Sequence, residues 1–338
     1  MKKIALITGI NGQDGYYLSN LLLSKNYHVI GISKKPNNNH KIENILGDIT
    51  CEEFLFNTIK TTKPNEIYNF AAKSKPAESW EKPIDSLKVN SLAPVNIFEA
   101  SKKFNPDCKI FQASSAEIFA SALDSSIKED STKNPINPYG AAKLYAHNMA
   151  KIYRESFGMF ISTGILFNHE SPMRGMNFIS QKITYAAACI KSGIQNSKIL
   201  NERGEPIVQN GKIALGNLDA RRDFGFAGDY VEAMWLMLQQ DNSDDFIIAT
   251  GETRSIRELC KAAFNYVNLN YEDYVVVNKS FIRPAETNNV TANISKSAKI
   301  LNWQPKTNFN SLIAELIEHH LTKINNNLKI SEKNLPLL

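Results

Sequence analysis

The chain has 338 residues, of which 43% are hydrophobic, so it is long enough for one large α/β domain with a smaller appended lobe. Lys and Arg outnumber Asp and Glu by only 39 to 34, and the surplus is spread along the chain, which argues against a nucleic-acid partner. No stretch approaches the roughly 20 apolar residues of a membrane span, and the four cysteines are too scattered for a zinc motif or a disulfide framework. We therefore expect a cytoplasmic protein with no membrane or metal partner, and the charge is compatible with an anionic small ligand.

The first half of the chain alternates short β-rich runs with helical patterns. The N-terminal run "KIALIT" breaks at a glycine loop and has no small-residue cleavage site, so it is read as a strand and not as a signal peptide. The expected strands lie at 3–8, 28–32, 66–71, 109–114 and 161–167. Alternation of this kind predicts right-handed βαβ units on a doubly wound parallel sheet of the Rossmann type, over residues 1–170.

The pattern loosens after residue 170. Residues 174–194 and 229–240 have helical periodicity, and Asn210-Gly211 between apolar flanks predicts a tight hairpin. We expect a smaller C-terminal α/β lobe over 171–325, with some segments returning to the sheet. Residues 326–338 are expected to form a polar, loosely held tail.

The stretch "ITGINGQDGYYL" places Gly9, Gly12 and Gly15 directly after a strand and at the start of a helix. Glycine lets the backbone turn sharply and approach a pyrophosphate, whose charge is stabilised at the helix N-terminus. Glycine spacing alone also fits an ordinary strand–helix turn. The correct context on both sides predicts dinucleotide binding.

The end of the second strand bears on the choice between NAD and NADP. An acid there would hold the ribose 2′-hydroxyl of NAD, whereas this sequence has Ser33, Lys34 and Lys35. Two cations with no nearby acid favour the 2′-phosphate of NADP, although lysines at a strand end are often only solvated.

"NPYGAAKLYAH" contains Tyr139 and Lys143 one helical turn apart, on one face of the expected helix. A phenol is a poor base at neutral pH, but a neighbouring ammonium favours its phenolate. Such a pair can move a proton on or off a carbinol. In an isolated YxxxK pattern, the alternative is that the tyrosine only packs against the protein and the lysine is only solvated. Together with the glycine loop and Ser115, the pattern favours catalysis.

At this point the chain resembles the extended short-chain dehydrogenase/reductase superfamily, and within it the GDP-mannose 4,6-dehydratase family. The resemblance covers about residues 3 to 320. It rests on "FNHESP", "NF", "LGNLDARRDFGFAGDYVEAMWLML", "ATGE", "RPAE" and "LNWQP", at 167–172, 177–178, 215–238, 249–252, 283–286 and 301–305.

The resemblance implies a lyase that uses NADP and leaves it chemically unchanged overall. Ser115-Ala116-Glu117 occupies the positions of the family's Thr-x-Glu, and serine keeps the hydroxyl. Once C4 of the sugar is a ketone, Glu117 can remove the C5 proton and then protonate the departing C6 oxygen. The expected catalytic residues are Ser115, Glu117, Tyr139 and Lys143. Without the resemblance, Glu117 would fit better as a partly exposed acid at a strand end that caps the next segment.

The resemblance also implies residues for the two ligands. Arg222 and Arg283 are expected on the diphosphate, since guanidinium groups match phosphate oxygens. Substrate contacts are expected from Asn168, Asn177, Arg222, Arg283 and Glu286. Cofactor contacts are expected from Gly9, Asn11, Gly12, Gln13, Asp14, Gly15, Lys34, Lys35, Asp48, Ile49, Phe70, Ala71, Ala72, Ser74, Tyr139, Lys143, His169 and Arg174. His169 also fits a satisfied core histidine.

Several departures from the family pattern concern the substrate. The family usually has paired arginines where this chain has Met173-Arg174 and Lys34-Lys35, and a second hydroxyl where it has Ala116. The segment 195–212 is longer than usual. A GDP-heptose or another nucleotide hexose is therefore an alternative substrate to GDP-mannose. A 4-epimerase or 4-reductase, or a non-catalytic NADP-binding protein, are alternative functions. A homodimer or homotetramer is expected.

Overall fold

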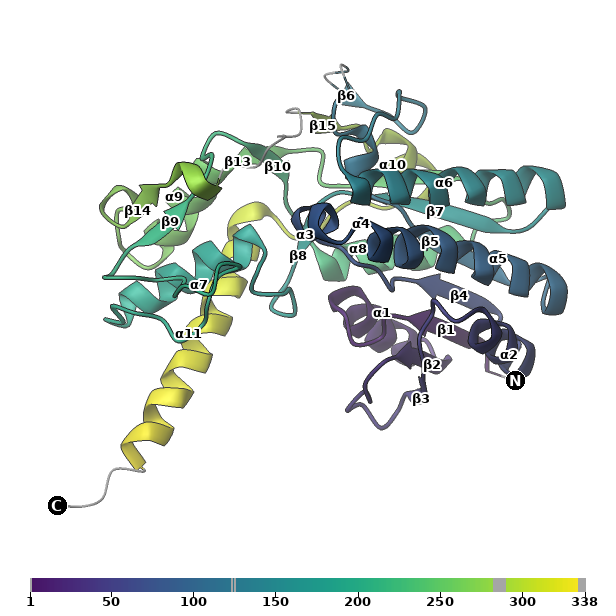
Figure 1. Cartoon of the computed structure of the whole chain (residues 1–338), viewed down its shortest axis with the longest axis horizontal. Helices are drawn as coiled ribbons and strands as arrows, with labels where there is room; N and C mark the ends of the chain where they lie inside the picture. The colour runs from purple at the N-terminus through teal and green to yellow at the C-terminus, as the bar shows by residue number, and fades with distance from the viewer. Residues whose placement is uncertain (1, 123, 125, 282–289, 334–338) are drawn as a thin grey trace. The chain divides into compact units, whose positions relative to one another are not determined.

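The structure is a computed structural model that describes residues 2–122, 124, 126–281 and 290–333, with side chains as far as Asn326. The described residues form two compact units (Figure 1). Unit 1 comprises Met1–His169, Ala227–Glu252 and Ala285–Lys306, and unit 2 comprises Glu170–Phe226, Thr253–Pro284 and Thr307–Leu338, in each case as far as they are described. Each unit is therefore assembled from three separate stretches of the sequence.

Unit 1 is built on a seven-stranded parallel sheet with the strand order β12-β7-β5-β4-β1-β2-β3. Its strands are β1 (Ile4–Thr8), β2 (His28–Ser33), β3 (Glu43–Leu46), β4 (Glu66–Asn69), β5 (Lys109–Ala113), β7 (Ile161–Leu166) and β12 (Asp245–Ile248). The central strands are rich in Ile, Leu and Val and are buried, as expected when helices cover both faces of a parallel sheet. The order outward from β1 is the Rossmann order, which confirms the predicted fold class.

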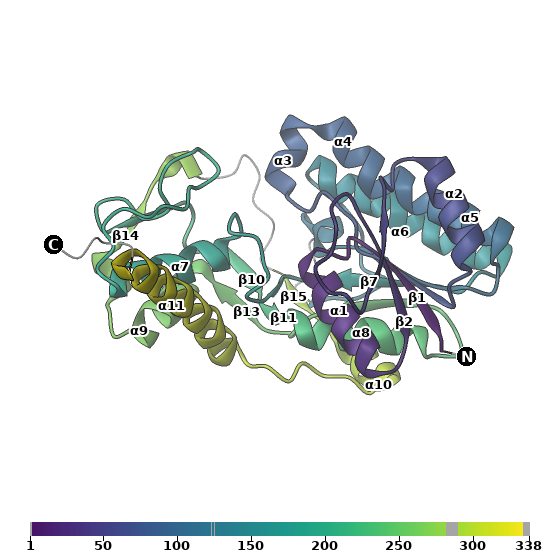
Figure 2. The same ribbon diagram turned by 90° about the horizontal axis from the view of Figure 1, so that it is seen from below.

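Helices cover both faces of this sheet, as Figure 2 shows. These helices are α1 (Gln13–Ser24), α2 (Glu52–Thr62), α5 (Ala93–Phe104), α6 (Pro138–Phe157) and α8 (Ala227–Leu238). Leu18 of α1 and Met234 of α8 share one core with Phe111 of the sheet. Helices α2, α5 and α6 contribute to a second core around Ile67 and Ile110. The helix α8, which lies after residue 226 in the sequence, therefore completes a face that begins with the first helix.

Short elements follow the carboxyl ends of the strands, where ligands bind in open parallel sheets. They are α3 (Pro76–Glu81), α4 (Pro83–Leu87), the π-helical turn η1 (Lys88–Leu92), the 3-10 turn η2 (Ala116–Phe119), β6 (Ser126–Ile127), β15 (Thr291–Ala292) and α10 (Ser295–Leu301). Strand β5 ends at Ala113, so the predicted strand end at Glu117 belongs to η2 instead. The strands β6 and β15 pair in parallel.

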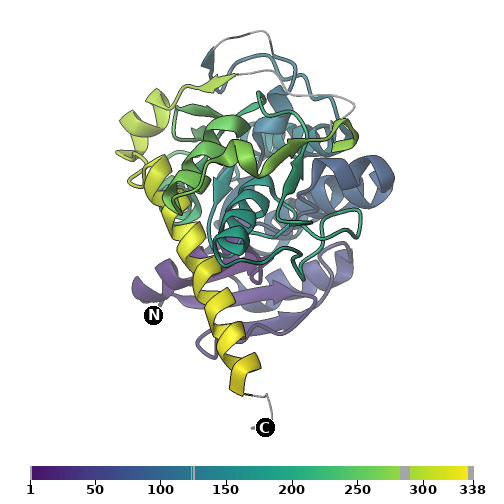
Figure 3. The ribbon, with the colours of Figure 1, turned by 90° about the vertical axis from the view of Figure 1, so that its left-hand side faces the viewer.

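Unit 2 packs three helices around its own core: α7 (Ile179–Lys191), α9 (Ile256–Tyr266) and α11 (Phe309–Lys333), the long helix in yellow in Figure 3. Its strands are β9 (Ile213–Leu215) and β14 (Val275–Val277), which pair in parallel, and β10 (Arg221–Asp223) and β13 (Thr253–Ser255), which pair antiparallel. The remaining elements are β8 (His169–Glu170), β11 (Gly225–Phe226), η3 (Tyr271–Asp273) and η4 (Lys279–Phe281). None of the helices, over the residues described, is long and apolar enough to cross a membrane.

The predicted hairpin at Asn210-Gly211 is confirmed. Gln209 and Lys212 form an antiparallel bridge, and their backbone groups exchange hydrogen bonds of 2.8 and 3.0 Å. Both central residues have positive φ, 49° at Asn210 and 71° at Gly211, as a type I′ turn requires.

Helix α11 continues to Lys333, past the boundary expected at residue 326. Between Phe309 and Lys333 the sequence has neither proline nor glycine, so nothing in the backbone stops the helix earlier. Residues 334–338 lie outside the described residues.

Candidate active site

The glycine loop between β1 and α1 has a backbone that only glycine allows at two positions. Gly9 has φ 71°, and a Cβ there would lie 2.9 Å from the backbone nitrogen of Ala71. A Cβ at Gly15 would lie 2.5 Å from the carbonyl oxygen of Ile10, so a side chain would push α1 away from the loop. These close approaches hold the N-terminus of α1 against the end of β1. The loop therefore fits a dinucleotide pyrophosphate.

The loop is braced against the segment that follows β2. Asn11 Nδ2 donates to the carbonyl oxygen of Lys35 at 2.8 Å, and Asn37 Nδ2 donates to Asn11 Oδ1 at 2.8 Å. The Asn11 side chain, expected at the cofactor, thus also fixes the backbone that carries the two lysines.

The sequence-based prediction that Lys34 and Lys35 have no nearby acid is wrong. Lys34 Nζ lies 2.6 Å from Asp48 Oδ2, with the lysine exposed and the aspartate half-buried. Desolvation raises the pKa of Asp48 but is outweighed by its hydrogen bonds to Lys34 and Thr50, so that the pKa is lowered. Asp48 comes after β3, an edge strand missed in the sequence, so its approach to Lys34 could not be foreseen.

The other expected cofactor residues lie on the segments after β3 and β4. Ala71 donates its backbone N–H to Thr8 Oγ1 at 3.1 Å, and the rings of Phe70 and Phe111 are 5.7 Å apart. Ile49 is buried in the core of unit 1. Ala72 is half-buried and Ser74 is exposed. Of this group, Ile49 and Phe70 therefore also take part in core packing.

Ser115 and Glu117 lie in the turn after β5. Ser115 caps η2, because its Oγ accepts the backbone N–H of Glu117 at 3.2 Å. Accepting this bond leaves the serine hydroxyl able to donate. Glu117 is half-buried, and Asn137 Nδ2 donates to its Oε2 at 2.8 Å.

Tyr139 and Lys143 lie on α6, one turn apart and both buried. Asn137 caps the helix, because its Oδ1 accepts the N–H of Gly140 at 2.8 Å, and Pro138 occupies the first helical position. Lys143 Nζ lies 5.9 Å from the centre of the Tyr139 ring. A Cβ at Gly140 would lie 2.7 Å from the carbonyl oxygen of Glu117, so glycine allows α6 to approach η2.

Lys143 reaches the sheet. Its Nζ donates to the carbonyl oxygen of Ala113, the last residue of β5, at 3.0 Å. Burial lowers the pKa of Lys143 to about 8, while the Asp14 carboxylate acts in the opposite direction. The structure thus brings Ser115, Glu117, Tyr139 and Lys143 together at the carboxyl end of β5.

His169 lies between the loop and the end of β7. Its Nε2 is 2.9 Å from Asp14 Oδ1, and its Nδ1 is 2.8 Å from the carbonyl oxygen of Phe167. Gln13 Nε2 donates to the backbone oxygen of His169 at 2.9 Å. His169, Gln13 and Asp14, expected separately as cofactor residues, form one connected group. Asn168 is half-buried beside them in the sequence.

Three further expected site residues, Arg174, Asn177 and Arg222, lie in unit 2. Arg174 Nε is 3.5 Å from the buried carboxylate of Glu170, and its guanidinium lies 3.6 Å from the centre of the Phe178 ring. Asn177 is exposed in the turn before α7, and Arg222 is half-buried on β10. Arg283 and Glu286 lie outside the described residues.

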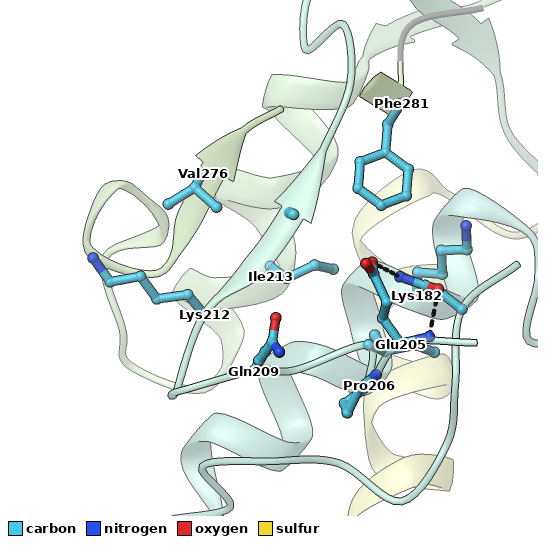
Figure 4. A pocket seen from close by; sticks show the side chains of 11 residues that line it. Lys182, Glu205, Pro206, Gln209, Lys212, Ile213, Val276 and Phe281 are labelled. Atoms are coloured by element: carbon cyan, nitrogen blue, oxygen red, sulfur yellow. Dashed lines mark hydrogen bonds between the residues drawn. The ribbon is translucent and has the colours of Figure 1, made fainter. Parts of the chain in front are cut away.

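Unit 2 also contains a small cavity of about 90 Å³ (Figure 4). Polar and apolar side chains line it, and none of them was expected at the site from the sequence. The lining residues are Lys182, Asn201, Glu205, Pro206, Ile207, Gln209, Lys212, Ile213, Ala214, Val276 and Phe281. More than half come from the long segment 195–212.

That segment is fastened to its surroundings. Lys182 of α7 pairs with Glu202, and the Arg203 guanidinium lies 4.4 Å from the centre of the Phe281 ring. Arg203 also donates to Ser280 Oγ at 2.8 Å. The segment 195–212 therefore forms one wall of the cavity.

Two residues near the expected catalytic residues were missed in the sequence. Asn137 could have been found, since Asn followed by Pro is a typical helix start, but its bond to Glu117 could not. Ser79 of α3 accepts the backbone N–H of Tyr139 at 3.1 Å, and no local pattern indicates this contact.

Comparison with known proteins agrees with this geometry. Residues 6–316 match the family model described as GDP-mannose 4,6 dehydratase. The GDP-mannose 4,6 dehydratase 1 of Arabidopsis thaliana is 39% identical over 341 residues, which cover 95% of this chain and 90% of that protein.

Two solved structures share the fold at low identity. The dTDP-glucose 4,6-dehydratase of Bacillus anthracis, in complex with NAD, aligns with a TM-score of 0.79 and 18% identity, over 96% of this chain and 98% of that one. RMD from Pseudomonas aeruginosa, complexed with NADPH, aligns with a TM-score of 0.77 and 18% identity, over 96% and 99% of the two chains. The match over most of the sequence places this chain in the GDP-mannose 4,6-dehydratase family.

Proposed function

We propose that this chain is an NADP-dependent lyase that converts GDP-mannose into GDP-4-keto-6-deoxymannose. The observation that carries the proposal is the position of Glu117. Its carboxylate is held by Asn137, two residues before Tyr139, at the end of the sheet where Lys143 also lies. A dehydrogenase or epimerase needs a proton acceptor for one hydroxyl, whereas a dehydratase also needs a group that removes the C5 proton.

Tyr139 is the base for the C4 hydroxyl. Lys143 lies on the same face of α6, and its ammonium favours the phenolate. Ser115 can donate a hydrogen bond to the C4 oxygen, since its Oγ already accepts from Glu117. Bound NADP would supply the hydride acceptor for C4 and the hydride donor for C6, and C5 would regain a proton as C6 receives the hydride.

Glu117 acts on the next two atoms of the sugar. A ketone at C4 acidifies the C5 proton, which the carboxylate removes. The protonated Glu117 then donates to the C6 oxygen, which leaves as water. Asn137 fixes the carboxylate by donating to Oε2, and the other oxygen, Oε1, is then available for the sugar.

NADP is favoured over NAD by the two lysines after β2. Lys34 and Lys35 are both exposed, and Lys34 is paired with Asp48. A 2′-phosphate carries more charge than a carboxylate and would compete with Asp48 for Lys34. Since the solved structures of this fold have been determined with NAD and with NADPH, the fold does not decide between them.

The nucleotide sugar is assigned mainly to residues 171–325. The relatives' names supply GDP-mannose, and Arg222 and Arg283 supply guanidinium groups for the diphosphate. Asn168, Asn177 and Glu286 are the further proposed contacts. The cavity wall formed by 195–212 is where this chain departs from the family pattern, which keeps a GDP-heptose or another nucleotide hexose as the alternative substrate. Assembly into a homodimer or homotetramer and a cytoplasmic location complete the proposal.

The test is the product mass after incubation with GDP-mannose and catalytic NADP⁺. Dehydration gives the loss of one water. A 4-epimerase leaves the mass unchanged, an oxidoreductase changes it by two hydrogens only, and a non-catalytic protein gives no turnover. Parallel incubations with UDP-glucose, dTDP-glucose and a GDP-heptose identify the substrate. Dehydration of one of these, with none of GDP-mannose, would overturn the choice of sugar and leave the chemistry intact.

A further inference from the structure

The ring of His169 has a hydrogen-bond acceptor at each nitrogen. Nδ1 faces the carbonyl oxygen of Phe167 at 2.8 Å, and Nε2 faces Asp14 Oδ1 at 2.9 Å. A carbonyl oxygen can only accept, so Nδ1 carries a hydrogen. An ionised carboxylate can also only accept, so Nε2 carries one too. With Asp14 ionised, both bonds exist only in the imidazolium form.

The alternative places the proton on Asp14 and leaves His169 neutral. Asp14 lies in the first turn of α1, where the helix dipole favours the carboxylate. Gln13 Nε2 lies 3.4 Å from the same Oδ1 atom and donates toward it. Both neighbours stabilise the ionised acid, so the proton belongs on His169.

We propose that Asp14 and His169 form a buried ion pair that neutralises the carboxylate at the start of α1 and thereby keeps the phosphate-binding end of this helix attractive to an anion. Asp14 lies between Gly12 and Gly15 in the first turn of α1, so an uncompensated carboxylate there would oppose a pyrophosphate at the same helix end. In this role His169 is a positioning residue, which acts through Asp14.

The histidine is well fixed for this purpose. Only 6% of its surface is exposed, and its ring stacks on Tyr230 with the ring centres 4.9 Å apart. Tyr230 packs in turn against Trp303, edge to face. The backbone oxygen of His169 accepts from Gln13, so the segment after β7 and the start of α1 are joined at two points.

The protonation is testable without any ligand. In the full-length apo protein with ¹⁵N-labelled histidine, both ring nitrogens of His169 should have imidazolium shifts at pH 7.5, about one unit above the ordinary histidine pKa. The signal is assigned by its loss in His169→Gln. A neutral ring protonated at Nδ1 only, at this pH, would overturn the proposal.

His147 provides the matched control in the same spectra. It is also buried beside an aspartate, but its Nε2 lies 3.6 Å from Asp245 Oδ2 and its Nδ1 has no hydrogen-bond partner among the described residues. Burial lowers the pKa of His147 to about 4. It should therefore be neutral under conditions in which His169 is charged.

The consequence for the anion site is tested with a double-mutant cycle on NADPH binding, followed by NADPH fluorescence. This binding experiment rests on the proposed cofactor. It needs no turnover, so a negative result here can be distinguished from failure of the proposed reaction. His169→Gln removes the nearest positive charge from Asp14, although the buried Lys143 ammonium still acts on the carboxylate, and should weaken NADPH about three- to tenfold. Adding Asp14→Asn removes the carboxylate charge, so the double variant should bind NADPH more tightly than His169→Gln alone. Additive losses would show that His169 acts by direct contact with the cofactor only, and would overturn the proposal.

Discussion

Asn137 Nδ2 lies 2.8 Å from Glu117 Oε2, so the residue that starts the helix α6 also holds the acid in the turn after β5. The same side chain accepts the N–H of Gly140 through its Oδ1. The position of the carboxylate is thereby tied to the start of the helix that carries Tyr139 and Lys143.

Glu117→Gln should block the reaction after C4 oxidation. Glutamine keeps the shape of the side chain but cannot take the C5 proton or protonate the C6 oxygen. We expect release of 4-keto-6-deoxy product to fall about 10²–10⁴-fold, and incorporation of solvent deuterium at C5 to fall with it. The measurement is product mass and deuterium content by mass spectrometry.

The matched control for this variant is Glu129→Gln, since Glu129 accepts the backbone N–H of Ile247 and has no proposed part in the chemistry. If Glu117→Gln releases product at nearly the wild-type rate, Glu117 has a structural role and not a catalytic one.

Asn137→Ser separates the two roles of Asn137. Serine keeps an oxygen for the helix cap, which is worth about 1 kcal/mol, but cannot reach Glu117 with an amide. Loss of a hydrogen bond to a charged group should lower kcat about 10-fold or more, while the melting temperature stays within a few degrees of wild type. Asn137→Ala should lose both kcat and stability. Equal kcat in Asn137→Ser and wild type would show that Glu117 needs no such support.

Tyr139→Phe removes the phenol and leaves C4 oxidation without its proton acceptor. Turnover should fall about 10²–10⁴-fold, whereas binding of the nucleotide sugar, measured by calorimetry, should persist. Tyr145→Phe, an exposed tyrosine on the same helix, serves as the control. A threefold effect or less in Tyr139→Phe would exclude Tyr139 as the base.

Lys143→Met should abolish turnover and raise the stability of the apo protein at pH 7. The folded-state pKa of Lys143 is about 8, below its ordinary value of 10.5, so the buried charge opposes folding. This penalty is present in full below pH 8 and disappears as the pH rises from 8 to 10.5, where the unfolded chain binds more protons. The pKa difference corresponds to about 3 kcal/mol, from which the loss of the bond to Ala113 subtracts about 1–3 kcal/mol. Urea unfolding at pH 7 and pH 10 should show the advantage of the variant shrinking at the higher pH. A constant difference would mean that Lys143 keeps its ordinary pKa.

Replacing Lys34 and Lys35 by alanine should weaken NADP far more than NAD, because only NADP carries the additional phosphate. The change also leaves Asp48 without its partner, which opposes the phosphate further. Lys41→Ala, another exposed lysine of this region, is the control. The affinities of the variants for NADPH and NADH are measured by cofactor fluorescence. Equal losses of affinity for both cofactors would show that the lysines contribute only general surface charge.

The repeating parts of the structure could be predicted from the sequence. Central strands such as 28–33 bury both faces and are continuous apolar runs, and the Asn210-Gly211 turn requires two positive φ angles that few other residues adopt. The edge strand β3 was missed because it is short and exposed and contains only two apolar residues.

Contacts between distant segments could not be predicted in the same way. Asp48 reaches Lys34 only because β3 pairs with β2, and Asn137 reaches Glu117 only because Gly140 lets α6 approach η2. Sequence periodicity describes neighbours along one element, whereas these pairs depend on which elements lie side by side.

The division of each unit among three stretches of sequence has a consequence for synthesis on the ribosome. The strand β12 and the helix α8, which complete the parallel sheet and one of its faces, follow the first stretch of unit 2. A nascent chain of residues 1–169 would expose β7 as an unpaired edge and leave the apolar surface of α1 partly uncovered. We therefore expect the cofactor-binding unit to gain resistance to proteases only after residue 306 has left the exit tunnel, and a fragment ending at residue 169 to aggregate when expressed alone.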